Sequence, residues 1–356
     1  MSDVPHLRFP EFSGEWEKYT IGDLCEEFKS GKNIKAESIQ EEGVYPVFGG
    51  NGLRGYTDRY NHDGDYVLIG RQGALCGNVR FVTGKTYITE HAIAAKATND
   101  NYTRYLEYLF VRLNLGQFSD QSAQPGLAVN KLLKIETFVP SKAEQLKIAF
   151  LLRLLDERIA TQNKIIEDLK LLKSAIRKRV FTSMKNEHTE SYEINQLLSY
   201  EQPTAYIVTN DEYSADTTLT PVLTANKGFV LGYTDEDFGI YQKGECIIFD
   251  DFTMDAKYVS FPFKVKSSAI KILTAKSNVN LRFMFEYLSY LGLKSEEHKR
   301  HYISEIASLV IELPSKEKQN RIANLMTSLD NKLALEEKAK TRYEDKKRYL
   351  LSQMFI

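Results

Sequence analysis

The hydrophobic residues between Pro140 and Phe181 recur at alternating steps of four and three positions. This is the heptad spacing of a coiled coil, and it continues without a glycine or a proline. The pattern predicts one helix of about 40 residues, ~60 Å long at ~1.5 Å per residue. Ser141 and Glu144 have the spacing of a capping box at its start. The seam consists of Ile148, Leu152, Leu155, Ile159, Ile166, Leu169, Ile176 and Val180, with Gln162 and Lys173 as its polar positions.

Pro314 begins a second stretch of the same kind, 174 residues after Pro140. At this constant offset Gln145 aligns with Gln319, and Asp156 aligns with Asp330. The repeat predicts an internal duplication whose two long helices pair, and two unrelated surface helices are the less favoured alternative. A two-fold axis between the halves would make the helices antiparallel. The second seam consists of Ile322, Met326, Leu329, Leu333, Tyr343, Leu350 and Met354, interrupted by Glu336, Lys340 and Lys347.

Short hydrophobic runs separated by glycine and asparagine turns precede each long helix, which predicts strands. Gly55-Tyr56-Thr57-Asp58 returns as Gly232-Tyr233-Thr234-Asp235, and Glu107-Tyr108-Leu109 returns as Glu286-Tyr287-Leu288. Each half is therefore expected to be a mixed α/β domain followed by a long helix, which gives an α+β fold with pseudo-two-fold symmetry. The expected boundaries are 1–140 and 185–314 for the domains, and 141–184 and 315–356 for the helices.

Composition describes an ordinary soluble protein, with 42% hydrophobic and 27% charged residues. The first residues lack the basic and apolar regions of a signal peptide, and no apolar run has the length of a membrane span. The three cysteines are scattered, which favours free thiols in a reducing cytoplasm over disulfides or a zinc site. The formal net charge of −1 means that a nucleic-acid partner would be met by local basic patches.

The candidate catalytic motifs are all weak. Gly49-Gly50-Asn51-Gly52 lacks the lysine and spacing of a phosphate-binding loop, so a hairpin turn is the better interpretation. Asp250, Asp255 and Lys257 resemble a nuclease set only faintly, and the corresponding loop of the first half has Arg71-Gln72 instead. No histidine forms a metal-binding pair with cysteine or glutamate, and the Asn-Pro-Pro-aromatic run of amino-methyltransferases is missing. We therefore expect no catalytic site. The basic residues near the helix ends, including Lys173, Arg177 and Lys347, are either a solvated face or a docking surface.

The chain resembles the specificity subunits of type I restriction-modification systems over nearly its whole length. The resemblance rests on Leu7-Arg8-Phe9-Pro10, on Trp16-Glu17, on the duplicated domain and on the two Pro-Ser-Lys helices. It implies two target recognition domains that each read half of a split site in double-stranded DNA. It also implies that the antiparallel helices dock two methyltransferase subunits, through which the nuclease-translocase subunits join. S-adenosylmethionine, ATP and magnesium would then be bound by those partners and not by this chain.

The resemblance does not identify the residues that read DNA, because the recognition loops are the variable part of the family. We selected side chains that pair with base edges or phosphates and that lie on turns between the repeated strands. A coiled-coil scaffold without a DNA role is the alternative reading, and a nuclease is third. The candidates are Asn51, Arg54, Arg71, Gln72, Asn78, Arg80, Gln121 and Gln124 in the first half, and Asn226, Lys227, Asp250, Asp255, Lys257, His298, Arg300 and His301 in the second.

Overall fold

The computed structural model describes residues 4–120, 126–184, 189–224, 228–293 and 302–356. The chain divides into two compact units, and each is described here by itself. Unit 1 comprises Met1–Asn163 with Lys338–Ile356, and unit 2 comprises Lys164–Glu337. Each unit therefore contains one α/β domain and part of each long helix.

The core of unit 1 is a four-stranded antiparallel sheet in the order β2-β8-β5-β6. Strand β5 is buried along its whole length, because α2 covers one face of the sheet and a second sheet, β4-β3-β7, lies beside it. A separate two-stranded ladder, β1-β9, precedes the long helix. The strands are β1 (Glu17–Thr20), β2 (Cys25–Ser30), β3 (Tyr45–Gly49), β4 (Gly52–Thr57), β5 (Tyr66–Gly70), β6 (Val79–Val82), β7 (Tyr87–Ile88), β8 (Ala92–Ala97) and β9 (Glu136–Val139). The helices are α1 (Ile21–Leu24), η1 (Ala36–Ser38), α2 (Thr103–Leu113), η2 (Leu115–Phe118) and α3 (Val129–Leu132).

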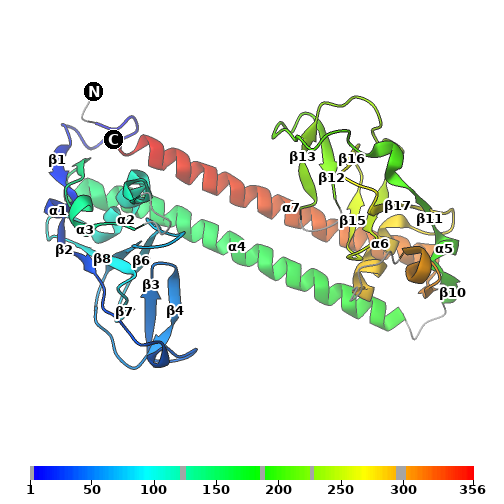
Figure 1. Ribbon diagram of the computed structural model, residues 1–356, viewed down its shortest axis with the longest axis horizontal. Helices are drawn as coiled ribbons and strands as arrows, with labels where there is room; N and C mark the ends of the chain where they lie inside the picture. Colours follow the sequence, from blue (N-terminus) through cyan, green and yellow to red (C-terminus); the bar gives the residue numbers. More distant parts are fainter. Residues whose placement is uncertain (1–3, 121–125, 185–188, 225–227, 294–301) are drawn as a thin grey trace. The chain divides into compact units, whose positions relative to one another are not determined.

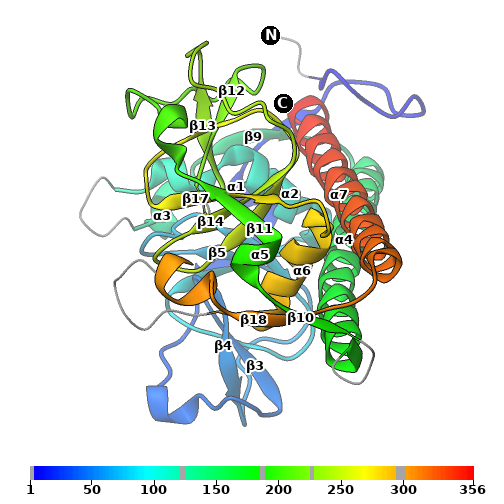
Figure 2. The same ribbon diagram turned by 90° about the vertical axis from the view of Figure 1, so that its right-hand side faces the viewer.

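Unit 2 repeats this arrangement strand for strand, which confirms the predicted duplication. Its sheets have the orders β11-β17-β14-β15 and β13-β12-β16, and β10 pairs with β18. Figure 2 shows α6 between the larger sheet and the long helices. The strands are β10 (Glu190–Glu193), β11 (Leu198–Glu201), β12 (Thr220–Leu223), β13 (Val230–Thr234), β14 (Cys246–Asp250), β15 (Ala256–Val259), β16 (Lys264–Val265), β17 (Ile270–Ala275) and β18 (Val310–Leu313). The helices are α5 (Ile194–Leu197), η3 (Pro203–Tyr206), α6 (Leu281–Leu291) and η4 (Tyr302–Ile306).

The two long helices are α4 (Lys142–Met184) and α7 (Lys316–Gln353), and they pack together within each unit (Figure 1). In unit 1, Leu152 of α4 shares a buried core with Leu350 of α7. In unit 2, Phe181 of α4 shares a core with Met326 of α7. The N-terminal part of α4 packs with the C-terminal part of α7, and the C-terminal part of α4 packs with the N-terminal part of α7, so the helices are antiparallel. Every predicted seam position is buried or half-buried, which confirms the heptad reading.

A buried glutamine ties each domain to its long helix in the same way. Gln145 and Gln319 are each 1% exposed. Their side-chain oxygens accept hydrogen bonds from the backbone N–H groups of Tyr102 and Asn280, which are the N-cap residues of α2 and α6. Their amide groups donate to the carbonyl oxygens at the start of the long helices. The repeat therefore includes buried polar contacts as well as the apolar seam.

The start of α4 differs from the predicted capping box. Both carboxylate oxygens of Glu144 accept from the Arg8 guanidinium, at 2.8 and 2.7 Å, so the side chain binds the N-terminal segment. The chain's C-terminus also belongs to unit 1, where the N–H of Leu7 donates to the carbonyl of Gln353 and the Phe355 ring stacks on Tyr105 (Figure 1). The segment around Leu7 and the end of α7 therefore both belong to unit 1.

The described residues contain no helix with an apolar stretch that could cross a membrane. Within the same residues, no group of three or more histidine, cysteine or acidic side chains could hold a metal ion. Cys25, Cys76 and Cys246 are free thiols.

Candidate nucleic-acid interface

Three turns of unit 1 meet at one end of its sheets. They are the β3–β4 turn, the loop after β5 and the turn between β7 and β8. The N–H of Arg71 donates to the carbonyl of His91 at 2.9 Å, which joins the second turn to the third. A Cβ atom on Gly50 would lie 2.7 Å from the same carbonyl, so only glycine allows the first turn to approach.

These turns form a hollow of about 330 Å³. It brings together three of the predicted side chains, those of Asn51, Arg54 and Gln72. His91 also lines the hollow, and its Nδ1 lies 3.2 Å from the Gln72 amide oxygen. All four side chains are exposed. They offer both donors and acceptors, the groups that read base edges in a DNA groove.

Arg80 extends this polar surface from β6. Its guanidinium lies against Gly52, where a Cβ atom would be 3.0 Å from one of its nitrogens. Gly52 also has a φ of 101°, which favours glycine. Asn78 is exposed at the end of the same loop, whereas the half-buried Arg71 contributes its backbone to the joined turns. Gln121 and Gln124 lie outside the described residues.

The corresponding turn of unit 2 places Lys257 in the position of Arg80. Arg80 pairs with Leu68 in the β5–β6 ladder, and Lys257 pairs with Ile248 in the β14–β15 ladder. Leu68 and Ile248 are each the third residue of equivalent strands. A cationic side chain therefore recurs at one register position of both domains. Asp255 is exposed in the same turn, whereas Asn226, Lys227, His298, Arg300 and His301 lie outside the described residues.

Asp250 has a structural role that the sequence analysis did not foresee. It is 5% exposed, and its Oδ1 accepts from the backbone N–H groups of Phe252 and Thr253, both at 2.9 Å. These bonds hold the turn after β14, where Met254 has a φ of 59°. So little exposed area leaves no surface for reading a base, and we remove Asp250 from the candidate set.

Asp251, the next residue, was missed by the sequence analysis. It is 1% exposed, its Oδ1 accepts from the N–H of Tyr302 at 2.8 Å, and its Oδ2 lies 3.4 Å from the buried Lys271 Nζ. In unit 1 the equivalent segments are the loop after β5 and the segment before α3. They are joined by a backbone hydrogen bond, from the N–H of Leu127 to the carbonyl of Arg71. The sequence signal for Asp251 is an acidic residue directly after a buried strand, because a buried carboxylate needs a cation or hydrogen-bond donors as partners.

The long helices carry one repeated ion pair. Lys347 Nζ lies 2.5 Å from Asp156 Oδ1 in unit 1, and Lys173 Nζ lies 2.5 Å from Asp330 Oδ1 in unit 2. The four residues are related by the 174-residue offset. Lys173 and Lys347, which the sequence analysis considered as part of a docking surface, therefore form ion pairs between α4 and α7.

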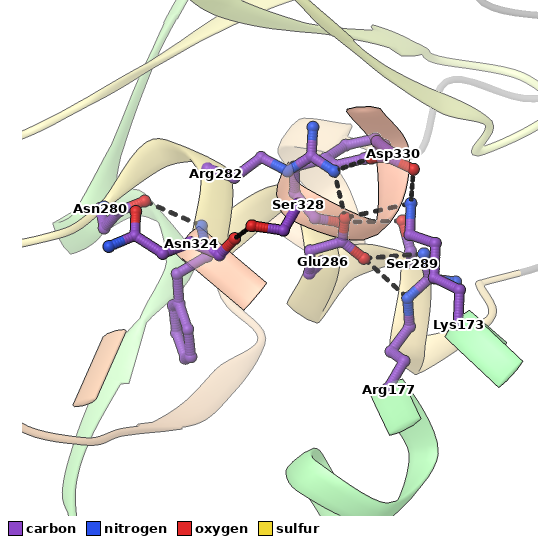
Figure 3. Close-up of polar contacts among 11 residues, drawn as sticks. Lys173, Arg177, Asn280, Arg282, Glu286, Ser289, Asn324, Ser328 and Asp330 are labelled. Carbon is purple, nitrogen blue, oxygen red and sulfur yellow. Dashed lines mark hydrogen bonds and ion pairs between the residues drawn. The ribbon is translucent and has the colours of Figure 1, made fainter. Parts of the chain in front are cut away.

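In unit 2 this pair belongs to a larger network, drawn in Figure 3. Glu286 of α6 is completely buried, and it binds Arg177 of α4 at 2.7 Å and Arg282 at 2.6 Å. Arg282 also binds Asp330 of α7. Burial alone would raise the pKa of Asp330, but hydrogen bonds from Lys173 and Arg282 outweigh it and lower the pKa. The network fixes α6 to both long helices.

Unit 1 uses fewer charges at the equivalent place. The Tyr108 hydroxyl donates to Asp156 at 2.8 Å, and Arg104 pairs with Glu107 at 3.0 Å. Burial raises the pKa of Glu107. The position equivalent to Arg177 is Leu351, which packs against the apolar core. The two domains are therefore fixed to the same helix pair by different chemistry.

Comparison with known proteins identifies the repeat. Residues 13–171 and 186–344 each match the family described as the type I restriction modification DNA specificity domain. The specificity subunit of the Escherichia coli type I restriction enzyme EcoprrI is 39% identical over 173 residues, or 48% of this chain and 42% of that protein. The EcoR124I/EcoR124II specificity subunit, also from E. coli, is 44% identical over 127 residues, or 34% of this chain and 31% of that protein. The matches thus span less than half the length of both relatives. The crystal structure of a type I system S subunit from M. genitalium shares the fold, with a TM-score of 0.73, 17% identity and 99% coverage of both chains.

Proposed function

The chain belongs to the type I restriction-modification DNA specificity family, and we propose that it is the DNA-recognition subunit of such a complex. Each α/β domain reads one half of a split site in double-stranded DNA. The observation that carries this proposal is the hollow formed by Asn51, Arg54, Gln72 and His91, set on a frame that unit 2 repeats. The cations Arg80 and Lys257 at one register position support a shared way of approaching DNA.

The long helices are proposed to dock two methyltransferase subunits, which methylate adenine and to which the nuclease-translocase subunits bind. Catalysis then belongs to those partners, as do S-adenosylmethionine, ATP and magnesium. The role of this chain is to place the partners on a chosen sequence. Saturable binding of S-adenosylmethionine to the purified chain in calorimetry would contradict this division of labour.

The test is the pattern of DNA methylation in cells that express the chain with its methyltransferase. Single-molecule sequencing should reveal a split motif with one modified adenine in each half. Arg80→Ala should relax or weaken recognition of the first half only, and Lys257→Ala the second half only, each by about 1–3 kcal/mol if the side chain reads a base. If both variants kept the wild-type motif and affinity, these loops would not read DNA. If no mobility shift occurred with methyltransferase present, the chain would be a scaffold without a DNA role.

A further inference from the structure

One exposed hydrophobic side chain lies in the polar hollow of unit 1. Leu53 is 51% exposed, and it lines the hollow together with Asn51, Arg54, Gln72 and His91. Those four side chains all offer hydrogen-bond donors or acceptors, whereas Leu53 offers neither. Arg54, the residue after it, has no ion-pair partner among the described residues. A base pair that entered this hollow would therefore meet one apolar group with polar groups around it.

A β-bulge in β4 presents this apolar group. Arg54 is the extra residue between Gly55 and Leu53, which pair with consecutive residues of β3. Gly55 has a φ of 145°, and a Cβ atom on it would lie 2.5 Å from the carbonyl oxygen of Gln40, so only glycine fits there. Consecutive side chains of a regular strand point to opposite faces, but a bulge re-aims them. As a result Leu53 and Arg54 are both exposed beside the hollow.

Unit 2 repeats the bulge at the equivalent place, in the strand pair β12 and β13 (Figure 1). Leu231 is the extra residue between Gly232 and Val230, which pair with consecutive residues of β12. Val230 is 40% exposed, so an exposed aliphatic side chain recurs at the register position of Leu53. The extra residue differs, because unit 1 has Arg54 where unit 2 has Leu231. The duplication therefore kept the bulge and the aliphatic group and changed their neighbour.

We propose that Leu53 and Val230 read thymine, each through contact with the 5-methyl group of one thymine in its own half-site. This inference rests on the proposed function. Among the unmodified bases only thymine presents a methyl group in the major groove, and apolar side chains recognise it by contact. A single exposed leucine is ordinary on a protein surface. Here the aliphatic group recurs at one register position, beside the same bulge, in both domains.

The test uses the full-length chain assembled with its methyltransferase subunits and a DNA duplex that carries the split site found by methylation sequencing. Each thymine of the site is replaced in turn by deoxyuridine, which lacks only the 5-methyl group. Fluorescence anisotropy at fixed salt should find one replacement in each half that weakens binding about fourfold, the effect of one buried methyl-sized group. Leu53→Ala should remove this response in the first half only. Val230→Ala should remove it in the second half only, so each variant is the matched control of the other.

Leu53 and Val230 are exposed, so the thermal unfolding of both variants should match that of the wild type. A split site in which no deoxyuridine weakens binding would overturn the inference. A Leu53→Ala variant that binds more weakly but still responds to deoxyuridine would assign Leu53 to a sugar or base-step contact, and would also overturn it. Both outcomes leave the proposed function intact, because the complex still binds its site. A wild-type complex that binds no DNA would overturn the proposed function itself.

Discussion

His62 is a buried imidazole of unit 1. Its protonation makes the free energy of unfolding of that domain depend on pH. Its Nε2 lies 3.0 Å from Glu27 and its Nδ1 lies 2.6 Å from the Asn61 side-chain oxygen. Burial lowers the pKa of His62, and this effect outweighs the opposing attraction of Glu27. Asn61 Oδ1 and the Glu27 carboxylate are both acceptors, so a neutral imidazole can donate to only one of them.

The first prediction concerns the pH dependence of stability. The unfolded chain takes up a proton on His62 below about pH 6.5, while the folded chain does so only at lower pH. The unfolded state then binds more protons, so the free energy of unfolding should fall as pH drops below about 6.5, by at most ~1.4 kcal/mol per pH unit. His62→Gln should flatten this slope in denaturant titrations between pH 5 and 7.5, whereas the exposed His91→Gln should keep it. An unchanged slope in His62→Gln would assign the effect to another group.

The second prediction compares Glu286 with its repeat counterpart, Glu107. Glu286→Gln removes the charge that compensates Arg177 and Arg282, and removing one partner of such a buried pair costs ~3–5 kcal/mol. Glu107→Gln should cost less than ~1 kcal/mol, because burial already disfavours the charged form and raises the pKa of Glu107. Chemical denaturation at pH 7 measures both. Equal losses would mean that the larger network of unit 2 does not add stability.

Single residues show where sequence reasoning was sufficient. Asn51, Arg54 and Gln72 were chosen as polar side chains on turns between the repeated strands, and the structure places all three around one hollow. Asp250 could not be assigned, since its bonds to Phe252 and Thr253 depend on a turn conformation that residue type does not specify. His91 was missed because its carbonyl bond to Arg71, which joins the two turns, is invisible in the sequence.

The long helices were the elements most directly encoded by the pattern of hydrophobic residues. Lys173 and Lys347 looked like interruptions of the seam, yet each pairs with an aspartate of the opposite helix. The heptad pattern gives the face that is buried, but it does not give the axial register. The repeated Asp–Lys pairs specify that register, because a slip by one heptad would separate every charge from its partner.

The third prediction is that the length of these helices sets the gap between the two half-sites. Inserting one heptad in each helix, near Ile159 and Leu333, keeps the seam in phase and adds about 10 Å at ~1.5 Å per residue. The methylated motif should keep its two halves and gain ~3 base pairs of spacer at ~3.4 Å each. The affinity for DNA should also fall. DNA turns by roughly a third of a revolution over that distance, so the second domain would approach its groove from a different side.

A four-residue insertion at the same places is the control, since it breaks the heptad phase and should destabilise the protein. Methylome sequencing reads the spacer directly. An active heptad variant that still marks the original spacing would show that the partner subunits place the recognition domains.

At the scale of the whole molecule, each half carries the charges needed to pair with a copy of itself. In α4 the order is Asp156 and then Lys173, and in α7 it is Asp330 and then Lys347, with the same separation. Two antiparallel copies of α4 would place each Asp156 opposite a Lys173. They would also bring Arg177 to the position of Leu351, near Glu107.

The fourth prediction follows from this complementarity. A fragment of residues 1–184 should form a dimer in light scattering at micromolar concentration, because isologous pairing covers its exposed seam. With methyltransferase it should mark a palindromic split site made of the first half-site twice. The fragment 185–356 is the matched comparison and should dimerise more weakly, since Leu351 would replace Arg177 beside the buried Glu286. A monomeric first fragment, or a second fragment that dimerises as tightly, would contradict the prediction.

The repeated Asp–Lys pattern also has a consequence for how such proteins change over generations. Because the two helices present the same charges at the same positions, a gene segment that encodes one domain with its helix can be exchanged for another without disturbing the pairing. Under the proposed function, a single crossover between repeats would combine two existing recognition domains into a subunit with a new split target. Such an exchange recombines complete recognition domains and leaves the residues within each domain unchanged.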